Sequence, residues 1–329
     1  PVVAIDGKIL ADNDLSLFFS LSDKYNFSLI TKVIELCEQR LNEILKSEDE
    51  LFDVTVYFKI KDKDEKNGEL KFRPMHTARL IDMICMVCIL NILMFEDDEK
   101  KGRRYSELSK MIPHNFFGNI PSVDVGRLFC RWQNKYKEYT ESFLKHCKKY
   151  QKSHQYLTEV NLDIQNFFPS VNPQIVYDFI TEHLSTSFSD ESDIKVLKRA
   201  VTKLLFFNIK PENLKDWEDV YYGTDRNITA TYHTNCGIPQ GLPQAYFFGN
   251  LVMIKIKDLM MSSDLFDGDA YFYVDDSVIY VPTALDEDEF NRRIETLNEK
   301  LREYCTEACN PSSDIGRYVN NKYLDFHSK

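Results

Sequence analysis

The hydrophobic positions switch between two periods along the chain, which predicts alternating helices and strands. Apolar residues recur at helical spacing over 27–46, whereas apolar and polar residues alternate over 52–60 as in a half-buried strand. Across the chain this predicts helices at 12–22, 27–46, 80–95, 123–150, 174–184, 194–207, 245–256 and 287–305. Strands are expected at 52–60, 70–73, 157–162 and 323–327, with a strand–turn–strand unit at 270–281. The mixture predicts an α+β fold.

The order of the elements suggests how the strands pair. Asn67 and Gly68 form a favoured hairpin turn, so residues of about 52–73 should make a protruding β-hairpin. From residue 156 on, the order is strand, helix, helix, strand, strand, helix, strand. This order is compatible with a split βαβ sheet covered by helices on one face.

Three carboxylates fall where these strands end. Asp163 follows the strand at 157–162, and Asp275 with Asp276 should form the turn of the 270–281 unit. Adjacent carboxylates between apolar strands repel each other and lose hydration, and a divalent cation relieves both costs. Neighbouring strands could therefore bring the three together as a two-metal centre. The alternative is that the aspartates simply make a polar turn.

Charge is unevenly distributed. The chain has a net charge of −11, but residues 100–152 carry 13 Lys/Arg against 4 Asp/Glu, a local balance of +9. This basic region favours a nucleic-acid partner, with Lys148 and Lys149 as contacts. Its aromatic residues could pack in the core or stack on bases. Solvated helix faces are the alternative explanation for the lysines.

Cysteine use and hydropathy indicate the compartment. The eight cysteines are scattered, as free thiols in a reducing compartment would be, and no signal peptide is visible. The apolar run at 80–95 is short for a bilayer and contains Asp82 and Asn91, so we expect a buried helix. These features predict a cytoplasmic protein without a membrane partner.

Four motifs in order resemble those of reverse transcriptases. Residues 273–276 resemble the Y-x-D-D sequence, 162–168 the first palm motif, 237–241 the G-x-P-Q-G loop, and 71–74 the R-P element of the fingers. The context is most similar to bacterial defence reverse transcriptases of the abortive-infection and related groups. The resemblance implies the fingers and palm of a right-hand polymerase. Residues 1–155 would hold N-terminal helices and fingers, with a basic helical region at 100–152, and 156–329 the palm. The thumb would lie largely beyond this sequence.

The resemblance assigns roles to individual residues. Asp163, Asp275 and Asp276 would be catalytic and would bind Mg²⁺, or Mn²⁺ in its place, with the Ile164 carbonyl as a further ligand. Phe168 would exclude the ribose 2′-hydroxyl, while Phe167 would be core, because successive strand residues point to opposite faces. The residues implied to bind substrate are Lys71, Arg73, Phe168, Gln240, Gly241, Tyr273 and Lys329.

The expected activity is RNA-directed DNA synthesis in antiphage defence. Its partners would be an RNA template or non-coding RNA, a DNA primer or product, and deoxynucleoside triphosphates; homo-oligomerisation would use regions outside this sequence. Template-independent or protein-primed DNA synthesis is one alternative. The other is a catalytically silent RNA-binding scaffold, which would have no reason to keep three desolvated carboxylates.

Overall fold

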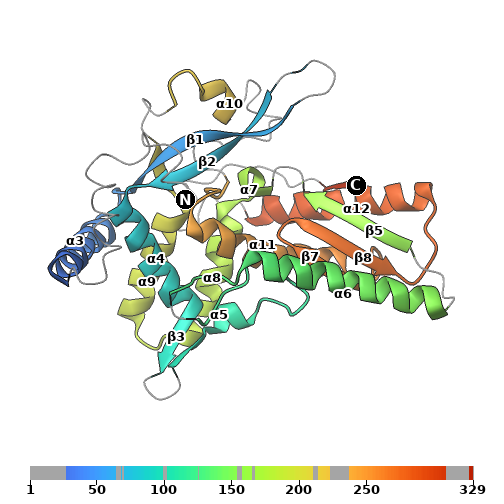
Figure 1. Cartoon of the computed structure of the whole chain (residues 1–329), viewed down its shortest axis with the longest axis horizontal. Coiled ribbons are helices and arrows are strands. Elements are labelled where there is room, and N and C mark those ends of the chain that lie inside the picture. Colours follow the sequence, from blue (N-terminus) through green and yellow to red (C-terminus); the bar gives the residue numbers. More distant parts are fainter. Residues whose placement is uncertain are drawn as a thin grey trace. The chain divides into compact units, whose positions relative to one another are not determined.

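The computed structural model has the mixed α+β composition that the sequence predicts (Figure 1). It describes residues 27–63, 68, 70–98, 102–124, 126–153, 158–164, 167–209, 214–222, 237–308 and 326–328. The helix expected at 12–22 lies outside these residues. The chain forms two compact units, each built from separated segments. The first contains residues 1–92, 188–231 and 239–245, and the second contains 93–187, 232–238 and 246–329.

The first unit is built on a three-stranded sheet with the order β2-β1-β6. Strands β1 (Phe52–Lys63) and β2 (Leu70–Ala78) form the expected antiparallel hairpin, which is longer than predicted. Strand β6 (Phe207–Ile209) pairs parallel to β1. Among the described residues, the helices of this unit are α3 (Phe27–Lys46), α4 (Leu80–Met94, which continues into the second unit), α9 (Glu191–Leu205) and α10 (Glu218–Tyr222).

Helix α9 is joined to the end of α3 by two buried or half-buried cations. The Lys203 ammonium, 1% exposed, donates to the carbonyls of Glu48 at 2.7 Å and Glu50 at 2.6 Å. Arg199 donates to the carbonyl of Leu45 at 2.5 Å. Carbonyls at a helix C-terminus lack intrahelical partners and favour cations. The bond from Arg199 therefore satisfies a carbonyl in the last turn of α3, and Lys203 holds the segment that follows the helix.

The second unit contains a four-stranded sheet with the order β7-β8-β5-β9. All its neighbouring strands are antiparallel. The strands are β5 (Thr158–Ile164), β7 (Asp269–Tyr273), β8 (Asp276–Val281) and β9 (Phe326–Ser328). The other described elements of this unit are β3 (Phe95–Asp98), β4 (Gly102–Tyr105), α5 (Glu107–Lys110), α6 (Trp132–Ser153), α7 (Phe167–Ser170), α8 (Pro173–Ser187), α11 (Pro243–Met260, whose first turn belongs to the first unit) and α12 (Glu287–Ala308).

The two faces of this sheet differ. One face carries the alternate apolar residues of β5, β7 and β8, all nearly inaccessible: Val160, Leu162, Ile164, Phe272 and Ile279. The other face carries Tyr271, Val278 and Tyr280, and α6 packs on it through Tyr139 and Phe143. Helix α6 therefore covers the face that carries Tyr271, Val278 and Tyr280. Aromatic residues on α6 and on the sheet bury each other there.

The basic region at 100–152 is not one helical segment. It includes β4, the partner of β3, and continues through the short helix α5 and an irregular stretch at 111–131 before α6 starts. Pro113 and Pro121 disfavour a helix, and Gly126 adopts a positive φ of 86°. The helix predicted at 123–150 therefore begins only at Trp132. None of the described helices is both long and apolar enough to cross a bilayer.

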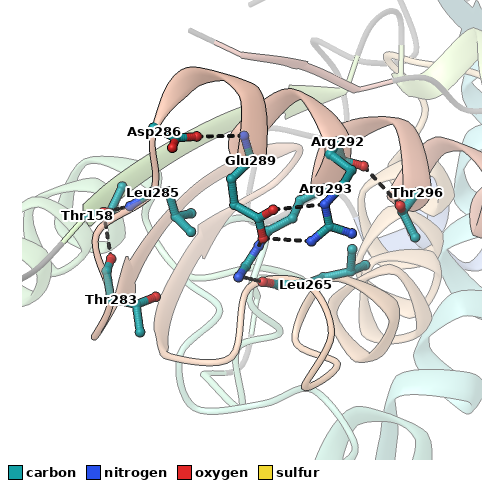
Figure 2. A network of polar contacts seen from close by, with 9 residues as sticks. All are labelled: Thr158, Leu265, Thr283, Leu285, Asp286, Glu289, Arg292, Arg293 and Thr296. Atoms are coloured by element: carbon teal, nitrogen blue, oxygen red, sulfur yellow. Dashed lines mark hydrogen bonds and ion pairs between the residues drawn. The ribbon is translucent and has the colours of Figure 1, made fainter.

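The start of α12 is tied to β5 by a polar network (Figure 2). The Thr158 hydroxyl donates to the carbonyl of Thr283 at 2.7 Å and accepts from the amide of Leu285 at 3.0 Å. Glu289 binds Arg292 and Arg293, and these guanidinium groups hold the pKa of its carboxyl at about 2. The network fixes the first residue of β5, the strand that carries Asp163.

Candidate active site

The strand register places two of the predicted carboxylates side by side on the same face of the sheet. Asp163 of β5 is the direct partner of Asp276 of β8, and Asp276 is also paired with Tyr273 of β7. Directly opposed residues in an antiparallel ladder point to the same face. Like charges there are destabilising unless something compensates them. Asp275 precedes Asp276 in the adjoining turn, so all three carboxylates belong to one end of one sheet.

The turn itself differs from the one expected. The sequence placed Asp275 and Asp276 in the loop, whereas the structure has Val274 and Asp275 there and Asp276 as the first residue of β8. Val274 has a φ of 59°. This backbone conformation is strongly unfavourable for a residue with a β-branched side chain. A positive φ at the first loop residue alone is the type II′ pattern, which normally uses glycine. Such strain costs about 1–3 kcal/mol and persists only where surrounding structure enforces it.

Residues 115–119 provide that surrounding structure. The Asn115 carbonyl accepts from the amide of Phe272 at 3.0 Å, and the amide of Phe117 donates to the Phe272 carbonyl at 2.9 Å. The segment thus pairs with the free edge of β7. At Gly118 an added Cβ would lie 2.5 Å from the Val274 nitrogen, so the two backbones are in contact. Only glycine allows this approach.

Helix α11 holds this support segment in place. The Asn250 side chain, 2% exposed, donates to the carbonyls of Gly118 at 3.0 Å and Asn119 at 2.9 Å. Asn119 itself has a φ of 52°. Sequence reasoning missed both Gly118 and Asn250. The available signal was the Gly-Asn pair after two phenylalanines, a bend between apolar residues.

Helix α6 is fixed to the sheet at its other end by His146. Its ring stacks on Tyr280, with 5.1 Å between the ring centroids, and its Nδ1 lies 2.9 Å from the Tyr271 hydroxyl oxygen. Its Nε2 lies 3.0 Å from a carboxylate oxygen of Asp269. Burial lowers the pKa of His146, while Asp269 opposes that shift. Nearer the turn, Tyr139 packs against Tyr273 at 5.6 Å.

In the first unit, a buried histidine holds the loop that contains Gln240 and Gly241. Both the amide of His76 and its ring Nδ1 contact the Gln240 carbonyl, at 2.8 and 3.0 Å. The Nε2 lies 2.9 Å from the Tyr221 hydroxyl. Because a carbonyl only accepts, Nδ1 carries the proton and Nε2 accepts from Tyr221. Gly241 has a φ of 110°, and a Cβ there would lie 2.6 Å from the His76 carbonyl oxygen.

This arrangement makes His76 a pH-sensitive element of the first unit. Burial lowers its pKa to about 4, against about 6.5 in the unfolded chain. Between these values only the unfolded chain binds the proton, so stability falls as pH drops from 6.5 towards 4, by about 1.4 kcal/mol per unit. An asparagine at position 76 can still donate a side-chain hydrogen bond to the Gln240 carbonyl, but its side chain does not titrate. In chemical denaturation, the free energy of unfolding of His76→Asn should fall less steeply over this pH range than that of Tyr221→Phe, which keeps the imidazole. Equal slopes in the two variants would contradict this assignment.

The other substrate residues predicted in the first unit lie on the returning strand of the hairpin. Lys71 and Arg73 are both exposed and, two positions apart on β2, share a face. Arg73 is the register partner of Lys59. Their predicted contact with a triphosphate stays a prediction. Lys329 lies outside the described residues.

Phe167 and Phe168 do not alternate as the sequence argument required. They belong to the short helix α7, and both are buried, at 2% and 7% exposure. Both rings lie against Gly249 of α11, where a Cβ would be 3.2 Å from Phe167 and 3.6 Å from Phe168. The core assignment of Phe167 is confirmed, whereas the strand argument that separated the two rings is wrong. Selection of the sugar by Phe168 stays a prediction.

The predicted nucleic-acid lysines lie together on the outer side of α6. Lys145, Lys148, Lys149 and Lys152 recur at spacings of three and four and line a groove of about 790 Å³. Lys148 and Lys149 are exposed. Glu141, Leu144 and Ser153 complete the lining, so the groove is basic overall.

Charge reversal at two of these lysines should weaken nucleic-acid binding. Lys148→Glu with Lys149→Glu should reduce the slope of log affinity against log salt by about two, because each phosphate contact contributes roughly one. Fluorescence anisotropy with a labelled RNA measures this slope. Lys195→Glu with Lys198→Glu on α9 is the control with the same charge change. Equal slopes for both variants would mean that the α6 lysines are merely solvated.

The oxygen atoms at this end of the sheet are of the type that binds magnesium, but the side chains do not converge into a coordination site. The donors are the carboxylates of Asp163, Asp275 and Asp276 and the carbonyl of Ile164, hard oxygen ligands of the kind Mg²⁺ prefers. Within the described part of the chain, no group of three or more His, Cys, Asp or Glu side chains converges tightly enough to hold a metal ion. Two opposed carboxylates and a third in the adjoining turn are what the fold provides.

No protein-family model matches the chain, and no curated protein matches it. The functional assignment therefore depends on the residues and their geometry.

Proposed function

We propose that this protein is a reverse transcriptase that adds deoxynucleotides to a 3′-hydroxyl. The observation that carries the proposal is the pairing of Asp163 with Asp276, next to Asp275 in a strained turn. Residues far apart in the sequence thus place carboxylates at one end of a sheet. Strain at such a turn costs stability, and strained backbone concentrates at functional sites.

The residues would divide the work as follows. Asp163, Asp275 and Asp276, with the Ile164 carbonyl, would hold Mg²⁺, or Mn²⁺, which supplies Lewis-acid activation and charge neutralisation in phosphoryl transfer. Tyr273, whose pKa burial raises, stays a neutral phenol beside the carboxylates and would support the primer end. Lys71 and Arg73 would bind the triphosphate, Arg through its planar fork. Gln240 and Gly241 would line the nascent base pair.

Deoxynucleotide incorporation with defined templates tests the proposal. The purified chain should incorporate labelled deoxynucleotides with Mg²⁺ or Mn²⁺ and lose this activity when EDTA removes the metal. Parallel reactions with a primed RNA, a primed DNA and no template identify the template. Incorporation without template would favour template-independent or protein-primed synthesis. RNA binding with no incorporation under any of these conditions would favour a silent scaffold and contradict the proposal.

The biological setting that we propose is antiphage defence by a cytoplasmic enzyme, with a non-coding RNA or other RNA template, a DNA product and deoxynucleoside triphosphates as partners. Its support is the context of the four motifs, which is most similar to defence reverse transcriptases. Sequencing the nucleic acid that copurifies with the protein would identify the template and product. Recovery of no bound RNA or DNA would contradict these partners.

A further inference from the structure

The aromatic residues of α6 have two different environments. Tyr139 is 6% exposed and packs on Phe117 and Tyr273. Trp132 and Tyr136 belong to the same helical stripe, yet they are 64% and 48% exposed. Aromatic residues on a stripe that packs elsewhere on a sheet are normally buried. The stripe therefore continues past the part of the helix that the sheet covers.

The uncovered end of the stripe lies at the acidic end of the sheet. His146, late in α6, contacts Asp269 and Tyr271 early in β7, whereas Tyr136 contacts Tyr273, the last residue of β7, at 5.1 Å. The helix therefore runs with its N-terminus towards the turn. Trp132 is one turn, about 6 Å, further along the axis than Tyr136. It lies beyond the strand end, on the side where Asp276 and Asp163 face out.

We propose that Trp132 and Tyr136 form a stacking platform for the bases of a single-stranded nucleic acid beside the carboxylates. The proposal extends the function proposed above, since it names how the strand that reaches Asp163, Asp275 and Asp276 is held. Base–aromatic stacking needs only an accessible π-face, so it accepts every base. Neither side chain has a role in the chemistry assigned above.

The charges around the platform favour a polyanion over an apolar protein surface. Exposed Arg127 and Arg131 precede Trp132 in the chain. The two nearest carboxylates on α6 are both paired with lysines: Glu138 with Lys135 at 2.6 Å, and Glu141 with Lys137 at 3.7 Å. Further along α6 the lysine groove continues the basic surface. Bases on the aromatics and phosphates on the cations are the combination used by proteins that bind single strands.

The chain offers a direct spectroscopic test, because it contains only two tryptophans, Trp132 and Trp217. Trp217 stacks on Phe58 at 4.7 Å in the first unit, so Trp217→Phe keeps an aromatic ring there and leaves Trp132 as the sole reporter. A short oligothymidylate should quench this fluorescence at saturation. An abasic phosphodiester of equal length should bind without quenching. In the matched Trp132→Phe protein, Trp217 should not respond.

Affinity gives a second readout. Trp132→Ala should weaken binding of the oligothymidylate by about tenfold or more and leave binding of the abasic strand unchanged. Ile92→Ala, at a residue 51% exposed on α4 and outside the lysine groove, is the control and should change neither. Absence of quenching, equal quenching by the abasic strand, or equal losses for Trp132→Ala and Ile92→Ala would overturn the platform. So would a concentration-dependent self-association that Trp132→Ala abolishes, which would make this face a contact between copies.

The same experiment separates the platform from the proposed activity. Quenching should persist in the Trp217→Phe protein that also carries Asp275→Asn and Asp276→Asn, since stacking needs no chemistry. Quenching by a protein that never incorporates deoxynucleotides would support the platform and contradict the polymerase. Incorporation without quenching would support the polymerase and overturn the platform.

Discussion

Replacing both turn carboxylates, Asp275→Asn with Asp276→Asn, should reduce deoxynucleotide incorporation by at least about a thousandfold and leave the fold intact. Losing a single transition-state ligand in an enzyme typically costs a hundred- to a thousandfold, and this variant removes two metal ligands together. The melting temperature without metal should stay the same or rise, because Asp276 no longer opposes Asp163 across the ladder. Single-nucleotide extension and thermal denaturation measure the two effects.

The control for this variant keeps the same change in charge. Asp264→Asn with Asp267→Asn alters two exposed residues in the loop before β7 and should leave incorporation near the wild-type rate. A residual activity of the turn variant within tenfold of the control would show that these carboxylates do not hold the reaction centre.

Gly118→Ala should lower incorporation by about a hundredfold, although residue 118 contacts no substrate in the proposed mechanism. The new Cβ would lie 2.5 Å from the Val274 nitrogen and 3.2 Å from the Tyr273 carbonyl carbon, and backbone atoms cannot rotate away. Either the turn or residues 115–119 must move. A displacement of about 1 Å in a catalytic group can cost a hundredfold in rate, and overpacking costs about 1–3 kcal/mol of stability.

A matched glycine separates the effect on the turn from the effect on stability. Gly102 also lies in the second unit and has a φ of 70°, with nothing within 4 Å of an added Cβ. Gly102→Ala should therefore cost about 1 kcal/mol through backbone strain and leave the extension rate unchanged. If Gly118→Ala and Gly102→Ala had similar rates, the packing of Gly118 on the turn would not matter for the proposed chemistry.

The sequence predicted those parts of the fold whose signals are local. Alternating residues marked β1, β5, β7 and β8, and the positions of Asp163, Asp275 and Asp276 at strand ends followed from them. The turn was misplaced by one residue because Val274 at a positive φ contradicts local preference, so the surrounding contacts decide its conformation. A propensity argument has no access to those contacts.

Long-range packing accounts for the other differences. Residues 115–119 lack regular periodicity, so their pairing with β7 could be found only from the structure. The contacts of His76 with Gln240 and Tyr221 also join segments far apart in the chain, so local sequence signals do not reveal them. In α6, one aromatic stripe was expected to be either core or stacking surface. Periodicity cannot tell where the sheet beneath a helix ends.

The most direct test of the central claim, that Asp163 and the turn carboxylates form one metal centre, is a titration of Mn²⁺ followed by electron paramagnetic resonance in the presence of a deoxynucleoside triphosphate. The wild-type chain should bind Mn²⁺ tightly at this centre. Asp163→Asn and Asp275→Asn should each weaken that same binding by about tenfold or more, while Asp267→Asn should not. Loss of binding in both variants, despite their distance in sequence, is what the account predicts. Binding that Asp163→Asn leaves at the wild-type affinity would contradict it.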